Sequence, residues 1–429
     1  MKTASAMQIR ETVAALLPAA QTLLCDMIRY PSTSGQEHEL MLFLERHFAG
    51  RGLEVERRPM HDALRDDSGY SSPVEGIRYD GRFNLRLRRP GSGGGRTVMF
   101  NAHSDVVPPS PGQDQAFEPR VEDGAVHGRG ACDDKGQIAL LALTLATLDA
   151  LDVRTGGDIL AHVVCEEENG GNGSLAMTRA GERADACIVL EPTEGRLLTS
   201  IRGAVWFRLV FRGVAGHSGM AGKTVSALLK ARDAIGILER YHAGLLAASR
   251  GFPLFDPYPN PMPITFGKLN AGNWPAAAPN TAVLEGVLGL LPNRTADQVC
   301  REMHAALVGG GLKGEWTVKA SAAELPAEGD DFRLSFMYRH DSSVLDPEHE
   351  LPRSLLASLR SCGQSPKVDA MTASCDACYY RNDLGIPVLV FGAGTLGVAH
   401  SIRENIRMAD IAAAAEGLVH FIATYTQGV

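Results

Sequence analysis

The segment TVMFNAHSD, residues 97–105, decides the fold, because an apolar run ends at once in polar, chemically active residues. The same pattern occurs three more times, in GDILAHVVCEEE (157–168), DACIVLEPT (185–193) and IPVLVFGAG (386–394). Short apolar runs bounded by Gly, Pro or Asp predict buried strands, and the stretches between them have helical periodicity. The sequence therefore predicts an α/β fold whose central mixed sheet is flanked by helices.

The polar residues at the ends of these strands indicate where a site lies. His103, Glu167, Glu168 and Glu191 directly follow predicted strands. In an open α/β sheet the binding crevice lies outside the carboxyl ends of the strands. We therefore expect these four side chains to share one crevice.

The order of expected helices and strands changes in residues 200–322. We expect strand, helix, strand, strand, helix and strand, in this order, at 204–213, 224–241, 262–269, 280–291, 295–308 and 315–321. This is the order of a split βαβ, ferredoxin-like α+β unit. Candidate metal ligands precede and follow this unit in the sequence. The sequence therefore predicts a catalytic domain in two segments (1–199 and 323–429) with an inserted lid domain (200–322). The GSGGG at 91–95 is expected to form a hairpin turn.

The composition favours a cytoplasmic protein that acts on a small molecule. Its net charge is -8, from 42 Lys+Arg against 50 Asp+Glu, and it has no basic stripe, which argues against a nucleic-acid partner. With 45% hydrophobic residues and a mean hydropathy of -0.07, no apolar run is expected to span a bilayer. Residues 1–30 predict an amphipathic helix and not a signal peptide, so we expect neither membrane insertion nor export.

The eight cysteines are dispersed along a large chain without an export signal, which favours reduced thiols. Cys375 and Cys378 have CxxC spacing. A structural zinc site would need a second pair of this kind. We interpret the two as ordinary small residues, with a redox pair as the alternative.

Histidine and carboxylate side chains supply the nitrogen and oxygen ligands that zinc accepts, and a catalytic zinc site keeps one position open for water. Asp105 stands two residues after His103, where its carboxylate could accept the second imidazole N–H and fix the tautomer. Asp133, in GRGACDDKG, lies in a tight turn from which one carboxylate could bridge two ions. The neighbouring Asp134 is expected to cap the helix that follows.

The triplet Glu166, Glu167 and Glu168 places three like charges at the end of a buried strand. These carboxylates repel one another, and bound cations would relieve the repulsion. One carboxylate could then bind metal while its neighbour takes a proton from water as general base.

Six motifs resemble one family when they are taken together and in order. They are HSDVVP, GRGACDDKG, EEENGGNGS, EPT, GVAGHSG and GAGTLGVAHSIREN, which run over nearly the whole chain. They resemble the successive signatures of the dinuclear zinc amidohydrolases that include acetylornithine deacetylase, succinyl-diaminopimelate desuccinylase, aminoacylase and glutamate carboxypeptidase.

The resemblance implies two metal ions and their ligands. It implies that one zinc is bound by His103 and Glu191, that the other is bound by Glu168 and His400, and that Asp133 bridges them. Because imidazole and carboxylate ligands tolerate several divalent ions, Co or Mn could replace zinc.

The resemblance also implies the catalytic residues. Glu167 corresponds to the general base, whereas Glu166 is an extra acid in a position that the family often fills with Asp. His217, in GVAGHSG, matches a histidine that reaches across a homodimer interface to polarise the scissile carbonyl. Water activated by zinc would attack an amide carbonyl, and Glu167 would carry the proton to the leaving nitrogen.

The sequence departs from the family where substrate is recognised. Many members have an Asn and an Arg in the lid that grip the substrate carboxylate, but here Ala276 and Gly289 lie near those positions, and Cys378 replaces a second Arg. Three arginines could replace this clamp, since a guanidinium presents a fork suited to a carboxylate: Arg202, Arg294 and Arg381. Surface charges are the alternative interpretation of all three.

The sequence thus predicts a hydrolase that cleaves an amide C–N bond, with deacylation of an N-acyl amino acid as the expected reaction. The alternative within the enzyme class is a dipeptidase or carboxypeptidase, or a hydrolase of an unusual C–N bond such as that of an aryl amine, because the carboxylate clamp is missing. The alternative outside that class is a metal-free binding protein on the same scaffold. A base beside five metal ligands argues against it.

Overall fold

The computed structural model describes residues 4–71, 74, 76–220, 222–318 and 324–427. Nine strands form a large mixed sheet in which β3 pairs in parallel with β6 and β7, whereas β2 pairs antiparallel with β1 and β6. Along the sheet the strands are β1 (Glu54–Pro59), β2 (Phe83–Arg89), β6 (Ile159–Val164), β3 (Val98–His103), β7 (Ala186–Val189), β18 (Val388–Val390), β8 (Leu197–Ile201) and β16 (Ser343–Val344), with β17 (Val368–Met371) paired to β8. All four strands predicted from the sequence are present, and the α/β class is confirmed.

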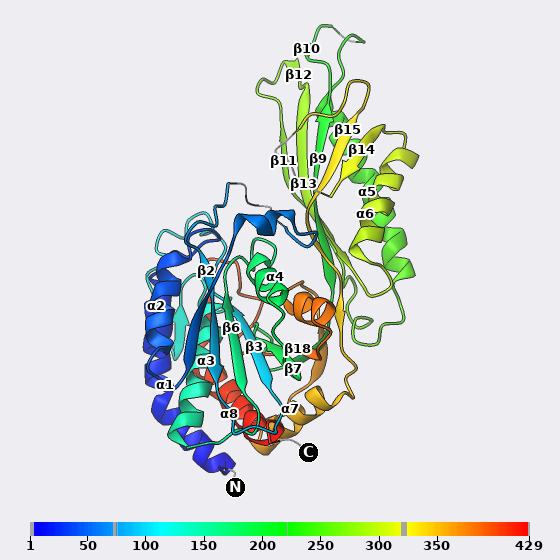
Figure 1. Ribbon diagram of the computed structural model, residues 1–429. Coiled ribbons are helices and arrows are strands. Elements are labelled where there is room, and N and C mark those ends of the chain that lie inside the picture. Colours follow the sequence, from blue (N-terminus) through cyan, green and yellow to red (C-terminus); the bar gives the residue numbers. More distant parts are fainter. Residues whose placement is uncertain (1–3, 72–73, 75, 221, 319–323, 428–429) are drawn as a thin grey trace.

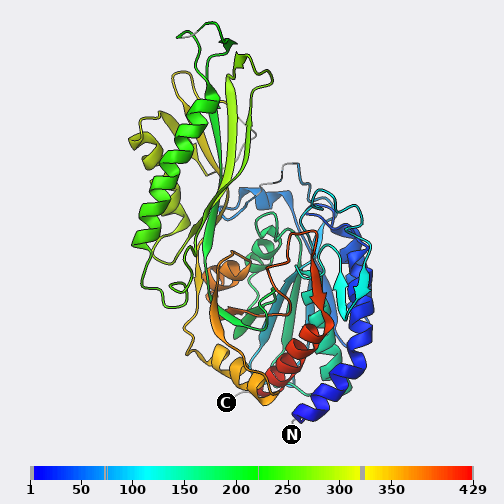
Figure 2. The ribbon, with the colours of Figure 1, turned by 180° about the vertical axis from the view of Figure 1, so that it is seen from behind.

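Helices cover both faces of this sheet (Figures 1 and 2), which explains why its central strands β3 and β6 are buried throughout. The main core lies under α1 (Ala6–Ile28), α2 (His38–Phe48), α3 (Lys135–Ala150), α7 (Glu350–Ser361) and α8 (Met408–Tyr425). On β3, Val98 and Phe100 face this core, whereas Met99 faces a smaller cluster on the other side. That side carries α4 (Asn172–Arg179) and the turn η2 (Tyr379–Asp383) (Figure 1).

The helix α1 differs from one expectation. By length and composition alone it is apolar enough to cross a membrane, although the sequence was expected to contain no such run. In the structure α1 packs against α3 and α8, and Ile9, Val13, Leu24 and Met27 are buried in the main core. Its apolar side therefore belongs to the folded domain.

A second, five-stranded sheet projects away from the large sheet (Figures 1 and 2). Its order is β11 (Ile264–Ala271), β13 (Thr281–Leu290), β9 (Gly203–Arg212), β15 (Phe332–His340) and β14 (Gly314–Thr317), and α5 (Ala227–Ala248) and α6 (Ala296–Gly309) pack on one face. All six elements expected in this part of the chain are present, and residues 319–321 of the last expected strand lie outside the described residues. The division at residues 199/200 and 322/323 remains a prediction. The pairing of β15 with β9 favours a return to the large sheet after residue 340.

Smaller elements complete the fold. They are β4 (Arg120–Glu122), β5 (Ala125–His127) and β19 (Asn405–Arg407) in one sheet, β10 (Gly216–His217) and β12 (Ala277–Ala278) in another, and the 3-10 turn η1 (Asp62–Asp66). The pair β10–β12 lies at the outer end of the five-stranded sheet (Figure 1).

The hairpin expected at residues 91–95 is wrong. β2 and β3 are not neighbours, because β6 lies between them. Gly91 and Gly95 instead allow close backbone packing, because a Cβ on either residue would clash with the backbone of Gly156 and Gly157. Glycine-rich segments serve both purposes, and the spacing of residues does not distinguish them.

Candidate active site

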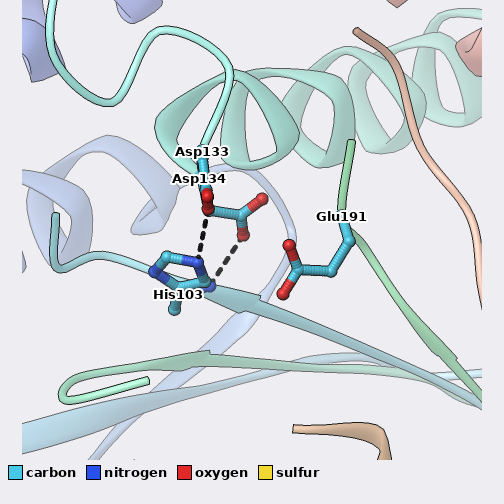
Figure 3. Close-up of side chains that lie close together, drawn as sticks. All are labelled: His103, Asp133, Asp134 and Glu191. Carbon is cyan, nitrogen blue, oxygen red and sulfur yellow. Dashed lines mark hydrogen bonds and ion pairs between the residues drawn. The ribbon is translucent and has the colours of Figure 1, made fainter. Parts of the chain in front are cut away.

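Four acidic and histidine side chains converge at the carboxyl ends of the central strands (Figure 3). His103 ends β3, Glu191 follows β7, and Asp133 and Asp134 lie in the turn before α3. One candidate ligand atom from each lies within 4.8 Å of the others, and all four residues are buried. Two of the four residues expected to share a site at the strand ends, His103 and Glu191, therefore lie together.

A second group shares Asp133 with the first and adds Glu168 and His400. Asp133 Oδ1 lies 3.0 Å from His103 Nε2, and Asp133 Oδ2 lies 3.2 Å from His400 Nε2. His400 Nε2 also lies 2.9 Å from Glu168 Oε1. Each oxygen of Asp133 thus faces a different imidazole, which is the arrangement that a carboxylate bridging two ions requires. The donor set of nitrogen and oxygen atoms fits two divalent metal ions.

Asp105 lies beside His103, but its contacts differ from those expected. His103 Nδ1 is 2.9 Å from the backbone oxygen of Asp105 and 3.5 Å from its carboxylate. The carboxylate accepts hydrogen bonds from the backbone N–H groups of Glu167 (2.9 Å) and Glu168 (3.1 Å) and from the hydroxyl of Ser34 (2.8 Å). A carbonyl acceptor at Nδ1 fixes the tautomer as well as a carboxylate does and leaves Nε2 free for a metal.

Asp134 occupies the N-cap position of α3, as predicted, but its side chain makes no capping hydrogen bond. Its Oδ2 instead accepts the backbone N–H of His103 at 2.9 Å. The backbone N–H of His103, at the end of β3, occupies this oxygen, so Asp134 holds the backbone of a candidate metal ligand in place.

His217 does not lie near this site in the same chain. It lies on β10 at the outer end of the five-stranded sheet and is exposed (Figure 1). Its Nδ1 accepts the backbone N–H of Gly219 at 3.1 Å, which leaves Nε2 directed elsewhere.

The three arginines considered for a carboxylate clamp have different surroundings. Arg294 forms an ion pair with Glu302 at 2.9 Å, and Arg381 donates to the carbonyl oxygens of Val344 and Ile386. Arg202 donates to the carbonyl oxygens of Thr372 and Gly203 and, in the described part of the chain, has no carboxylate partner.

Arg202 also lies beside Gly289, near the position where the family clamp was expected. A Cβ on Gly289 would lie 2.5 Å from Arg202 Nη1, so the guanidinium fills the space that a side chain at 289 would need. Burial lowers the pKa of Arg202 to about 10, which leaves the side chain charged at neutral pH.

The crevice concentrates negative charge away from water. Burial raises the pKa of Glu167 and Glu191 well above the usual range, and neighbouring carboxylates raise it further. Burial alone would lower the pKa of His400, but hydrogen bonds to Asp133 and Glu168 raise it to about 11. In the same way His103 has a raised pKa although burial opposes the charge. Divalent cations would replace these protons and neutralise the carboxylates.

A family model described as "Peptidase family M20/M25/M40" matches residues 99–424, from the second residue of β3 to the last turn of α8. The chain belongs to this family. It is therefore a hydrolase that acts on amide bonds, and the alternative of a metal-free binding protein is not favoured.

Curated relatives in this family include deacylating enzymes. The chain is 28% identical over 414 residues to succinyl-diaminopimelate desuccinylase of Methylobacterium radiotolerans, covering 92% of this chain and 93% of that one. It is 24% identical over 349 residues to N-formyl-4-amino-5-aminomethyl-2-methylpyrimidine deformylase of Halalkalibacterium halodurans, covering 76% and 78%. Among solved structures, a dipeptidase of Saccharomyces cerevisiae has a TM-score of 0.76 at 14% identity and covers 98% of both chains. This last likeness shows the shared fold.

One buried pair behind Asp133 in this M20-family site was not predicted from the sequence. Glu404 Oε1 accepts the backbone N–H groups of Cys132 and Asp133 at 3.2 Å each, and Glu404 forms an ion pair with Arg129. Both side chains are 1% exposed. The Arg of GRG and the Glu of SIREN were visible as motif residues, but their pairing depends on a contact between segments far apart in the chain.

We expect the metal-free protein to lose stability as pH rises from about 5 to 9. Glu167, Glu191, His103 and His400 all have folded-state pKa values above their unfolded values, so the folded chain holds protons that the unfolded chain releases. Asp133 and the buried His162 and His340 have lowered pKa values and act in the opposite direction, mainly below about pH 7. Thermal unfolding with chelator, and then with added Zn²⁺, measures the effect.

Zinc should raise Tm more at pH 8 than at pH 5.5, because protons compete with the metal for the same atoms. A metal-free Tm that rises over this pH range would contradict the assigned electrostatics.

Proposed function

We propose that this hydrolase removes an acyl group from a small N-acyl amine, with an N-acyl amino acid as substrate. The observation that carries the proposal is the shared Asp133, whose two oxygens each face one histidine, with Glu167 one residue from Glu168 in the same crevice. Such a group suits attack of water on an amide carbonyl. The named activities of the desuccinylase and the deformylase, both removals of an acyl group, support the reaction class.

The proposed metal site consists of two divalent ions, zinc by preference. His103 and Glu191 would hold one ion, Glu168 and His400 the other, and Asp133 both. When bound, the ions would lower the pKa of a water molecule and polarise the carbonyl oxygen of the substrate.

The chain's own residues supply the remaining steps. Glu167 takes the proton of the attacking water and passes it to the leaving nitrogen. Asp105 holds the backbone of Glu167 and Glu168 by two hydrogen bonds and so aims both carboxylates. The backbone oxygen of Asp105 orients His103.

Arg202 is proposed to bind the carboxylate of the substrate. Its charge has no carboxylate partner in the described part of the chain, and it occupies the space beside Gly289. A guanidinium that keeps free N–H donors favours an acidic ligand. This supports an N-acyl amino acid over an acylated amine without a carboxylate.

One assay tests the proposed function: release of amine by the zinc-reconstituted protein from N-acyl amino acids, dipeptides and acylated aromatic amines. Cleavage of N-acyl amino acids and not of the matching amino-acid amides would support the role of Arg202. Cleavage of only the aromatic amines would favour the second candidate, for which the aminopyrimidine deformylase is the supporting relative. If no substrate in the panel is cleaved, the proposal fails.

We further propose that the enzyme is a cytoplasmic homodimer in which His217 acts on the active site of the partner subunit. Its exposure at the outer end of the lid sheet supports this, since it leaves the side chain free to meet a second copy. His217→Ala should lower kcat by about 10²-fold, the loss typical of one oxyanion donor, without release of metal.

Complementation distinguishes action across the dimer from action within one chain. Neither His217→Ala nor Glu167→Gln should be active alone. A hybrid dimer has one complete site, so random mixing of the two variants should restore about a quarter of the wild-type rate. Absence of any recovery, or loss of zinc from His217→Ala, would contradict the assignment.

A further inference from the structure

A buried ion group lies behind the proposed general base, and the proposed mechanism assigns no role to its residues. Arg82 on the chain just before β2 forms ion pairs with Glu37 and Glu166. The side chains are 6%, 0% and 0% exposed. Charges are removed from water at a large cost, so a group of this kind is retained where it fixes a particular geometry.

Glu166 is held in a conformation that its side chain alone would not choose. Its φ is +60°, in the left-handed region that residues other than glycine rarely adopt. Such a conformation persists only where surrounding contacts determine it. Besides Arg82, the Glu166 carboxylate accepts the hydroxyl of Tyr79 at 2.9 Å and the side-chain N–H of Asn172 at 2.8 Å.

The left-handed turn at Glu166 decides where the next two amides point. Immediately after it, the N–H groups of Glu167 and Glu168 donate to the Asp105 carboxylate. A right-handed or extended residue at 166 would rotate these two peptide planes away from Asp105. The direction of the Glu167 side chain therefore depends on the contacts that hold Glu166.

The contacts close into a ring around this part of the site. Arg82 Nη2 donates to Glu37 Oε2 at 2.7 Å, and the same oxygen accepts the backbone N–H of Gly35 at 2.9 Å. Ser34, the residue before Gly35, donates its hydroxyl to Asp105 at 2.8 Å. Asp105 is thus held both by Ser34, next to the segment that Glu37 binds, and by the backbone after Glu166. Arg82 connects the two because it pairs with Glu37 and with Glu166.

We propose that Arg82 is a positioning residue for the catalytic base: through Glu166 it holds the turn that presents Glu167 and Glu168, and through Glu37 it holds the segment that orients Asp105. The effect of Arg82 on catalysis rests on the proposed function, whereas its effect on the position of the Glu167 and Glu168 backbone does not. Arg82 is the ion-pair partner that the structure gives the buried Glu166 carboxylate. Removal of Arg82 would leave that carboxylate buried without a counter-charge.

The first measurement is hydrogen exchange of backbone amides in metal-free Arg82→Met, with Arg57→Met as the matched control. Arg57 makes a bidentate ion pair with Glu45 but is 48% exposed and lies outside the site. We expect exchange at Glu167 and Glu168 to accelerate at least about 10-fold in Arg82→Met and to stay within about 2-fold of wild type in the control. Arg82→Lys, which keeps the charge but not the fork, should recover part of the protection.

The second measurement separates positioning from a loss of stability. With both metals bound, Arg82→Met should lower kcat by about 10-fold or more and leave KM within about 3-fold, because the ground-state contacts of the substrate are unchanged. If Arg82→Met does not fold, Tyr79→Phe removes one hydrogen bond to Glu166 and should accelerate the same two amides by a smaller factor.

Exchange in Arg82→Met that is unchanged at Glu167 and Glu168, or accelerated equally throughout the protein, would overturn the inference. This result is independent of activity. If the wild-type enzyme cleaves no amide in the panel while local exchange responds to Arg82, the proposed function fails and the positioning role stands; if the enzyme cleaves amides and exchange does not respond, the opposite holds.

Discussion

Glu167→Gln should lower kcat by at least about two orders of magnitude while both metal ions stay bound, since a general base contributes about 10²- to 10⁴-fold. Glutamine has the shape of glutamate but cannot take a proton from water. The substitution leaves the backbone N–H of Glu167 on Asp105, so the path of the chain should not change. Steady-state kinetics together with metal analysis of the same sample measure both effects.

Glu122→Gln is a suitable control for this substitution. The Glu122 carboxylate is 58% exposed and pairs with Arg120 on the surface, so its replacement should leave kcat unchanged. A near-normal rate in Glu167→Gln would remove that residue from the role of base. Loss of metal in Glu167→Gln would instead make it a ligand.

The sequence predicts which residues lie close together where these residues follow the ends of strands. His103 and Glu191 lie together because the strands before them are parallel neighbours of the same sheet, a relation that apolar runs and their polar ends reveal. The tight turn already indicated a bridging role for Asp133, but only the family resemblance assigned Asp133 and His400 to one site, since a turn and a late loop carry no periodicity that would bring them together.

What the sequence did not predict depends on contacts between distant segments. Arg82 and Glu166 are far apart in the chain, and nothing in the pattern around either residue marks a buried partner. Likewise, the order β2–β6–β3 made the glycines at 91–95 a site of close packing and not a hairpin. Sheet order decides such cases, and local sequence does not encode it.

Asp133→Asn should release metal from both positions, because Asp133 is the one residue shared by the two groups. Loss of a residue that only supports a ligand costs about 10- to 100-fold in metal affinity, so loss of a bridging ligand should cost more than about 100-fold. Asparagine keeps the size of the side chain but offers one neutral oxygen in place of two charged ones. Titration of the metal-free variant with Zn²⁺ and a competing chelator gives the two affinities, and turnover should fall below detection at metal concentrations that saturate the wild type.

The neighbour Asp134 provides the control, because its position near the ligands does not by itself make it one. Its carboxylate lies within the same group of candidate ligand atoms, but Oδ2 is already occupied by the backbone N–H of His103. An amide oxygen can accept that N–H, so Asp134→Asn should keep both metals and most of its activity. The adjacent, isosteric substitutions thus have opposite expected results. Equal loss of metal from both variants would mean that Asp134 binds metal directly, and retention of metal by Asp133→Asn would exclude a bridging carboxylate.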